Sequence, residues 1–161
     1  MHWQAALCYV LTLKESISPI YWLNIAEPGM PFIACIEHTN FVAPGNYNGK
    51  HYVYLSKYLE PDDPYFTMPE DDVIASYLPH LRKVNKDFDR SWISRFWVFR
   101  ERAAQPIITL NYSERIPDHR TPLPGLYLAN TSQIYPEDRG TNYSVRLGNQ
   151  IAEMVAADLR R

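Results

Sequence analysis

The sequence predicts an α+β fold in which a mixed, largely antiparallel sheet is covered by helices. Several segments before residue 100 alternate their side chains with a period of two, which is typical of strands. Two later segments, which begin near residues 70 and 141, repeat apolar residues every three or four positions, which is typical of amphipathic helices. With 161 residues and a hydrophobic content of 46%, the chain is long enough to bury a core.

The first predicted strand is Ala6–Leu13, and both of its faces are largely apolar. Such a strand belongs inside a sheet that is covered on at least one side. Two further strands, at 20–25 and 32–36, are expected to be antiparallel, because the sequence Glu27-Pro28-Gly29 between them is typical of a turn. Another strand is predicted at 92–99, which is rich in aromatic and β-branched residues.

The predicted strand at 51–58 carries a row of tyrosines on one face. The residues of that face are Tyr52, Tyr54, Ser56 and Tyr58. Aromatic rows of this kind pack across strands, and they also line pockets for flat or apolar substrates. The sequence leaves both interpretations open.

The first helix is expected to begin near Thr67 and Glu70, whose spacing is that of a capping box. Pro79 is expected to kink this helix, because proline removes one backbone donor. After an irregular, proline-containing stretch, the chain is predicted to form a short strand at 124–130, a polar loop and a last helix at 141–159. Gly148 and Ala152 are small, so the inner face of that helix could be approached closely by another backbone.

Charge and hydropathy exclude several classes of function. The 16 basic and 18 acidic residues form no run of one sign, so neither nucleic acid nor an anionic membrane is an expected partner. No apolar run approaches the roughly 20 residues that a membrane-spanning helix needs. The N-terminus lacks the pattern of a signal peptide, which favours a cytoplasmic location. Cys8 and Cys35 lie in apolar segments and are predicted to be buried, reduced thiols.

No catalytic residue can be named from the sequence. Glu37 and His38 are adjacent on a predicted strand, so they point to opposite faces and cannot bind one ion together. The five histidines lack the spacing of metal ligands, and we therefore expect no metal site. None of Ser91, Ser113 and Ser132 has the flanking glycines of a nucleophile elbow.

The loop 137–142 leads into the last helix and is the candidate for ligand binding. The first amides of a helix have no intrahelical partner and carry the positive end of the helix dipole, so they can hold an anion or a carbonyl. The alternative is that Thr141 or Asn142 only caps the helix.

The stretch Thr121–Ala129 (TPLPGLYLA), followed by the helix from Gly140 to Ala152, resembles the closing motif of FAD-dependent amine oxidases and their protoporphyrinogen-oxidase and phytoene-desaturase relatives. The resemblance implies that the last strand, loop and helix belong to the FAD-binding half of such a protein, with the N-terminus of the helix directed at the flavin. Asn130 stands where many members have a glycine followed by an acidic residue. By position, Asn130 and Thr131 would lie beside the ribityl chain, and Gly140, Thr141 and Asn142 would offer backbone contacts to the isoalloxazine edge.

Earlier segments resemble the substrate domain of the same family. They are Tyr21–Ile25, Pro31–Phe41 and Ala104–Pro106. The resemblance therefore divides the chain into a substrate-domain portion at 1–120 and the strand-loop-helix at 121–161, which we expect to form one compact unit. The candidate walls of the substrate pocket, chosen by face and residue type, are Tyr52, Tyr54, Trp97 and Phe99.

The sequence has no GxGxxG motif after a strand, although family members carry one near their N-terminus. We therefore expect a truncated or split flavin-dependent oxidoreductase that binds FAD and a small organic substrate only with its missing N-terminal FAD-binding segment. The chain alone is expected to be inactive and without FAD. Two alternatives remain open: a fragment of a flavin-dependent isomerase like UDP-galactopyranose mutase, and a non-catalytic module that forms homo-oligomers through the inner face of its last helix.

Overall fold

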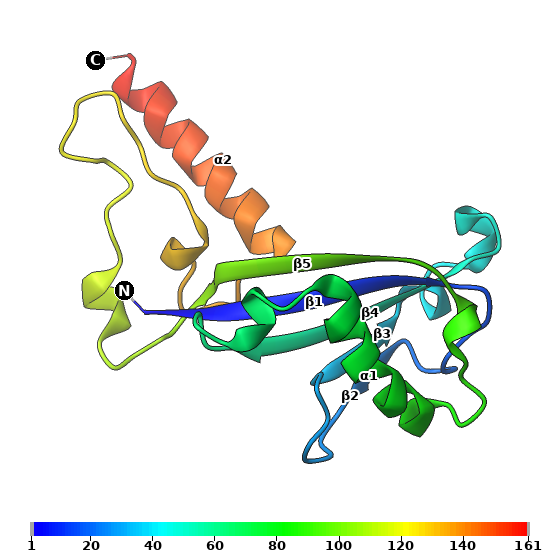
Figure 1. Cartoon of the computed structure of the whole chain (residues 1–161). Helices are drawn as coiled ribbons and strands as arrows, with labels where there is room; N and C mark the ends of the chain where they lie inside the picture. The colour runs from blue at the N-terminus through cyan, green and yellow to red at the C-terminus, as the bar shows by residue number, and fades with distance from the viewer. Residues whose placement is uncertain (1, 161) are drawn as a thin grey trace. The chain divides into compact units, whose positions relative to one another are not determined.

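Five strands and two α-helices make up the regular structure of residues 2–160, the part of the chain that the computed structural model describes (Figure 1). In chain order they are β1 (Trp3–Leu13), β2 (Trp22–Asn24), β3 (Ala34–Glu37), β4 (His51–Leu59), α1 (Glu70–Val84), β5 (Ile93–Pro106) and α2 (Thr141–Asp158). The predicted α+β fold class is confirmed.

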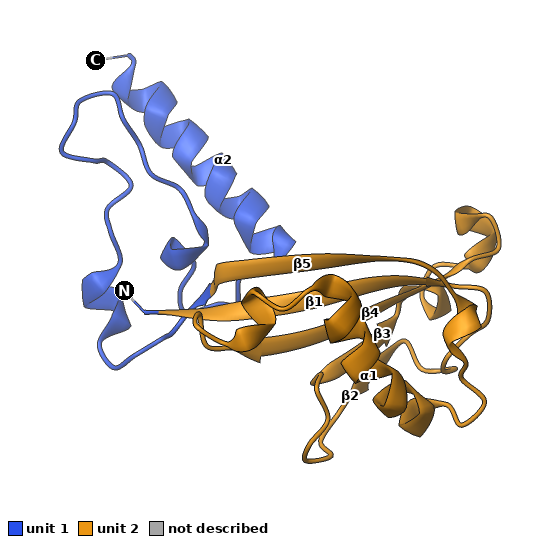
Figure 2. Ribbon diagram, in the orientation of Figure 1, with its two compact units in different colours: residues 1–2, 105–161 blue, residues 3–104 orange. Residues whose placement is uncertain are grey.

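The chain divides into two compact units (Figure 2). Unit 2 comprises residues 3–104 and contains the sheet and α1. Among the described residues, unit 1 comprises His2 and residues 105–160, and it contains α2. The sequence-based boundary at 120/121 therefore falls inside unit 1.

The sheet of unit 2 has the strand order β2-β3-β4-β1-β5. The pairs β1 with β4, β4 with β3, and β3 with β2 are antiparallel. In the register of the central pair, Tyr9 lies opposite Leu55 and Val10 opposite Tyr54. Helix α1 covers one face of this sheet (Figure 1). Side chains alternate between the faces along each strand, so the register sorts them into a core face under α1 and an opposite face.

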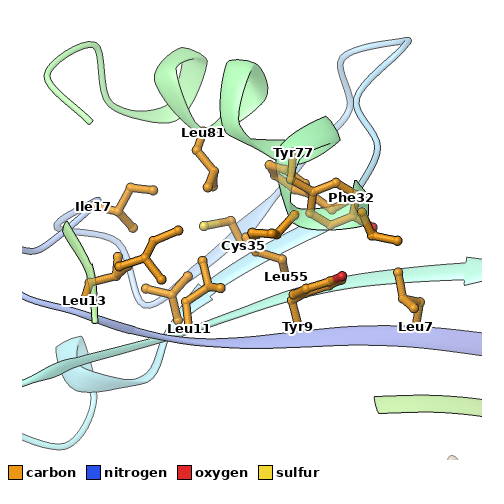
Figure 3. Packing of buried hydrophobic residues seen from close by; sticks show 14 of the residues in the cluster. Leu7, Tyr9, Leu11, Leu13, Ile17, Phe32, Cys35, Leu55, Tyr77 and Leu81 are labelled. Carbon is orange, nitrogen blue, oxygen red and sulfur yellow. The ribbon is translucent and has the colours of Figure 1, made fainter. Parts of the chain in front are cut away.

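The core lies between α1 and the sheet (Figure 3). The β1 side chains of the core face are fully buried, as their alternation predicted; they are Leu7, Tyr9, Leu11 and Leu13. The rings of Tyr9 and Tyr77 are 5.4 Å apart, which ties β1 to α1. The two cysteines are free, with Cys35 buried and Cys8 half-buried. Burial raises the pKa of the Cys35 thiol to about 12, so this thiol is unreactive at neutral pH.

Helix α1 begins later than a capping box at Thr67 requires, and that prediction is wrong. The N-cap is Pro69, with no side-chain cap. The Thr67 hydroxyl instead donates to the Pro64 carbonyl at 3.2 Å, because Thr67 closes the preceding 3₁₀ turn, η3 (Pro64–Phe66). Pro79 lies inside α1, which continues to Val84.

The predicted strand at 124–130 is reduced to one isolated bridge, between Arg120 and Tyr127. This segment is held by side chains rather than by a ladder. Asp158, in the last turn of α2, accepts two hydrogen bonds from Arg120, at 2.8 and 3.0 Å, and one from the Tyr127 hydroxyl at 2.8 Å. These contacts fix the end of α2 to the 120–127 segment within unit 1.

Helix α2 has the predicted extent, within one residue of its expected end. Leu147 and Ile151 on its apolar face pack against Ile134 in a small second cluster. Gly148 and Ala152 are exposed, and a Cβ at Gly148 would meet no atom within 4 Å. Association through this face therefore stays a prediction.

Candidate functional site

The turn before α2 is open to solvent. Thr141 and Asn142 are exposed, and Gly140 is half-buried. Gly140 is the N-cap residue and provides no side-chain cap, so neither Thr141 nor Asn142 occupies the capping position that the alternative interpretation required. The amides of the first helical turn are thus available for a ligand, as a helix N-terminus without a cap allows.

The side chain of Asn142 folds back over Gly140. A Cβ atom on residue 140 would collide with Asn142 Oδ1 and would also lie 3.6 Å from Tyr143 Cδ2. The backbone of Gly140 has φ −77° and ψ 160°, which any residue can adopt. Glycine at this position therefore provides space beside the turn, and the conformation itself does not demand it.

A polar hollow of about 100 Å³ lies beside the first turns of α2, within unit 1. Its lining residues include Gln133, Glu137, Tyr143 and Arg146. Arg146 donates to Glu137 Oε1 at 2.5 Å, and this hydrogen bond lowers the pKa of the Glu137 carboxyl. Ligand pockets usually measure roughly 300–1,000 Å³, so this hollow cannot enclose a ring system. A ring at this turn would bind across an open surface.

The resemblance implies that Asn130 and Thr131 follow the end of a strand, whereas in the structure they begin a 3₁₀ turn. Asn130 is the N-cap of the 3₁₀ turn η6 (Thr131–Gln133), and its Oδ1 accepts hydrogen bonds from the Ser132 amide at 2.9 Å and the Ser132 hydroxyl at 2.6 Å. The Gln133 side chain completes the capping box by accepting from the Asn130 amide. The side-chain oxygen of Asn130 is therefore committed to the turn, whereas Thr131 is exposed.

The four candidate wall residues share the sheet face opposite α1. Val53 and Leu55 are buried in the core, so the alternate residues Tyr52 and Tyr54 point to the other face. On β5 the core-facing residues are Phe96 and Val98, which places Trp97 and Phe99 on the same opposite face. These four residues, Tyr52, Tyr54, Trp97 and Phe99, form what we call the aromatic face.

The aromatic face is partly covered at one end and exposed at the other. The ring of Tyr47 lies 5.1 Å from that of Tyr52, and the ring of His38 lies 6.2 Å from that of Tyr54. Burial raises the pKa of Tyr54, so its hydroxyl is neutral at physiological pH. Phe99 on the edge strand is 58% exposed. The face offers a flat apolar surface with a neutral hydroxyl.

A buried pair that sequence reasoning missed lies on the core face, at the end of β3. Glu37 is fully buried, and its Oε1 lies 2.9 Å from His51 Nδ1. Its Oε2 accepts the amides of Ile17 at 3.0 Å and Ser18 at 2.9 Å. A buried carboxylate needs a hydrogen-bond partner. An acidic residue at a core-facing strand position could therefore have indicated this pair from the sequence. The pair holds the loop after β1 in place.

Within residues 2–160, no group of three or more histidine, cysteine, aspartate or glutamate side chains is arranged to hold a metal ion. In the same residues, neither helix combines the length and the apolar character that crossing a membrane demands. The chain thus offers two separate candidate surfaces: the open turn before α2 in unit 1, and the aromatic face in unit 2.

Comparison with known proteins gives a match at the level of fold. No protein-family model matches the chain, and no curated protein matches it. Among solved structures, the fold is similar to that of a "putative protoporphyrinogen oxidase" from Exiguobacterium sp. 255-15, with a TM-score of 0.65 and 14% sequence identity. The match covers 99% of this chain and 36% of that chain. The present chain thus has the fold of about a third of the Exiguobacterium protein.

Proposed function

We propose that this chain is the substrate-side and C-terminal portion of a flavin-dependent oxidoreductase of amine-oxidase type. The observation that carries the proposal is the match of 99% of the chain to 36% of the Exiguobacterium protein, whose name describes an oxidase. In this proposal, a dinucleotide-binding segment outside the 161 residues holds most of the FAD, and the chain alone does not retain the cofactor. A small organic substrate is oxidised.

The turn before α2 fits a flavin contact. Its amides lack a side-chain cap, and Thr141 and Asn142 are exposed. Backbone amides at a helix N-terminus favour negative charge and carbonyl oxygens, which a flavin ring edge presents. Gly140, Thr141 and Asn142 would therefore hold the ring edge through backbone donors.

Only one of the two residues expected beside the ribityl chain is free to contact it through its side chain. Because Asn130 Oδ1 already accepts two hydrogen bonds from Ser132, it has little capacity left for a ribityl hydroxyl. In this proposal the exposed Thr131 makes the ribityl contact, and Asn130 positions Thr131 by capping η6.

Bound FAD supplies the redox chemistry, which removes a hydride or electrons from the substrate. The chain contributes the surface on which the substrate lies. The aromatic face presents flat apolar rings that exclude water and orient a planar or apolar molecule. The neutral Tyr54 hydroxyl can donate one hydrogen bond to a polar group of the substrate.

The coding sequence on the 5′ side of the Met1 codon tests the proposal. We expect a strand followed by GxGxxG, in frame or in a neighbouring frame, because the pyrophosphate of FAD requires backbone amides at such a turn. A complete reading frame that provides no dinucleotide-binding segment, neither there nor in an adjacent gene, would argue against a role as part of a flavoenzyme.

Tyr54 is expected to contribute to substrate binding but not to FAD binding. In the flavin-loaded complete protein, Tyr54→Ala should raise KM by roughly fivefold, which corresponds to about 1 kcal/mol of lost ring contact. The ratio of flavin to protein should stay unchanged. Tyr54→Phe is the matched control and should keep most of the affinity, because it retains the ring. Unchanged kinetics in Tyr54→Ala would remove this residue from the pocket wall.

A further inference from the structure

A groove of about 380 Å³ lies along the solvent-exposed side of α1, within unit 2. Its volume falls within the usual range of ligand pockets, roughly 300–1,000 Å³. The lining residues come from α1 and from the segment between α1 and β5; they are Ala75, Leu78, Pro79, Arg82, Phe88 and Arg90. Neither the open turn before α2 nor the aromatic face includes any of these residues.

The floor of the groove is apolar. Phe88 is 3% exposed, and its ring lies 5.7 Å from that of Trp92 in an edge-to-face arrangement. Leu78 is half-buried and packs against the core cluster between α1 and the sheet. This floor suits an apolar side chain of a ligand, because contact with Phe88 and Leu78 removes apolar surface from water.

One backbone acceptor of the groove has no donor at the usual place in the helix. Pro79 lies inside α1, and proline has no N–H group to donate to the carbonyl four residues earlier. That carbonyl belongs to Ala75, which is exposed and lines the groove. A ligand that carries an N–H group can therefore donate a hydrogen bond to Ala75.

Two guanidinium groups line the groove toward the C-terminal end of α1, and backbone carbonyls position both. Arg82 Nε donates to the Phe88 carbonyl at 3.2 Å, and Arg90 Nη1 donates to the Ile93 carbonyl at 3.5 Å. The Asp89 carboxylate is 3.9 Å from Arg82 Nη2, which is too far for a hydrogen bond. Each guanidinium therefore keeps N–H donors for the carboxylate of a ligand.

We propose that this groove binds the C-terminal end of a peptide whose last residue is apolar. The terminal carboxylate accepts hydrogen bonds from Arg82 and Arg90, and the last side chain lies on the apolar floor. Ala75 and Arg82 are seven residues apart, or about 10 Å along the helix axis. An extended peptide covers about 3.3 Å per residue, so its last three residues span the groove and bring an N–H group to the Ala75 carbonyl.

Calorimetric titration with short synthetic peptides tests the proposal on the 161-residue chain, without flavin. N-acetyl-alanyl-alanyl-phenylalanine should bind saturably at millimolar concentration. The same peptide with a C-terminal amide lacks the charge and should bind about tenfold or more weakly. N-acetyl-phenylalanine cannot span the groove to the Ala75 carbonyl and should bind about fivefold more weakly, which distinguishes a peptide end from a free acylamino acid.

Substitutions assign the two ends of the groove. Arg82→Gln and Arg90→Gln should each weaken binding of the tripeptide by about tenfold. Pro79→Ala restores an N–H group that occupies the Ala75 carbonyl, so it should weaken the tripeptide by about fivefold and leave N-acetyl-phenylalanine unchanged. Lys86→Gln is the matched control. It removes one positive charge from a side chain that is 90% exposed and outside the groove, and it should bind like wild type.

Four results would overturn the proposal: no saturable binding of the tripeptide to wild type, equal affinity for its amide, equal affinity in either arginine variant, or equal affinity in Pro79→Ala. Circular dichroism and thermal melting check that each variant is folded. Because no cofactor enters the measurement, failure here leaves the proposed flavin function untouched, and failure of the flavin function leaves this result valid.

Discussion

Replacing Glu37 with leucine is expected to lower the free energy of unfolding by about 3–5 kcal/mol, the range for removal of one member of a buried pair. The carboxylate is fully buried and accepts the amides of Ile17 and Ser18 as well as His51. Leucine fills a similar volume but leaves both amides without an acceptor inside the protein. Urea unfolding of the 161-residue chain measures the loss.

Glu37→Gln is the matched control. The amide oxygen of glutamine can still accept the two backbone N–H groups, and its NH₂ can donate to a neutral His51. We therefore expect a smaller loss, of about 1–2 kcal/mol. If Glu37→Leu unfolds within about 1 kcal/mol of wild type, the carboxylate does not anchor the loop after β1.

Thr141→Pro should weaken FAD binding to the complete protein by about tenfold, or about 1.4 kcal/mol, because it deletes one donor of the turn before α2. The helix should tolerate the change. The first helical position has no intrahelical partner for its amide, and proline is favoured there. Gly140 already has φ −77° and ψ 160°, the extended conformation that a residue before proline requires.

Thr141→Ala separates the backbone donor from the side chain. It keeps the amide and loses only the exposed hydroxyl, so FAD affinity should stay close to wild type. Titration of the apoprotein with FAD gives both affinities, and circular dichroism checks that α2 is retained. Equal affinity in Thr141→Pro and Thr141→Ala would show that the Thr141 amide does not contact the flavin.

Alternation and helical spacing were enough to predict most of the fold. These patterns predicted the core face of β1, the row of tyrosines on β4 and the extent of α2. An element that is buried on one side repeats its apolar residues with the period of that element. Strand β5 was predicted only to Phe99 and reaches Pro106. The second half of β5 was not predicted, because the charged residues Arg100, Glu101 and Arg102 interrupt the apolar pattern. An edge strand can carry charges that a central strand cannot.

Long-range pairing was harder to predict. Sequence reasoning compared Glu37 with its neighbour His38, whereas its partner is His51 on the adjacent strand. The register that places Glu37 opposite Val53 brings His51 within reach, and this register depends on how β3 and β4 pair. Likewise, local spacing suggested that Thr67 caps α1, but its hydroxyl donates to the Pro64 carbonyl of η3 instead.

For the candidate site, the sequence offered the turn before α2 as a ligand position, beside the alternative of a helix cap, and it grouped the four aromatic residues as candidate pocket walls by face and residue type. It did not predict that Asn130 would cap η6, because that role depends on the contacts of Ser132 and Gln133. Asn is a preferred N-cap residue, and unlike glycine it has a side-chain oxygen that can accept the Ser132 amide. The departure from the motif therefore has a local structural reason.

The visible absorption spectrum of the purified complete protein, compared with that of the 161-residue chain, tests the central claim most directly. We predict about one flavin per molecule for a protein that includes the proposed dinucleotide-binding segment, and no flavin band for the 161-residue chain alone. A stoichiometric flavin band on the 161-residue chain, or a complete protein that takes up no FAD, would contradict the account.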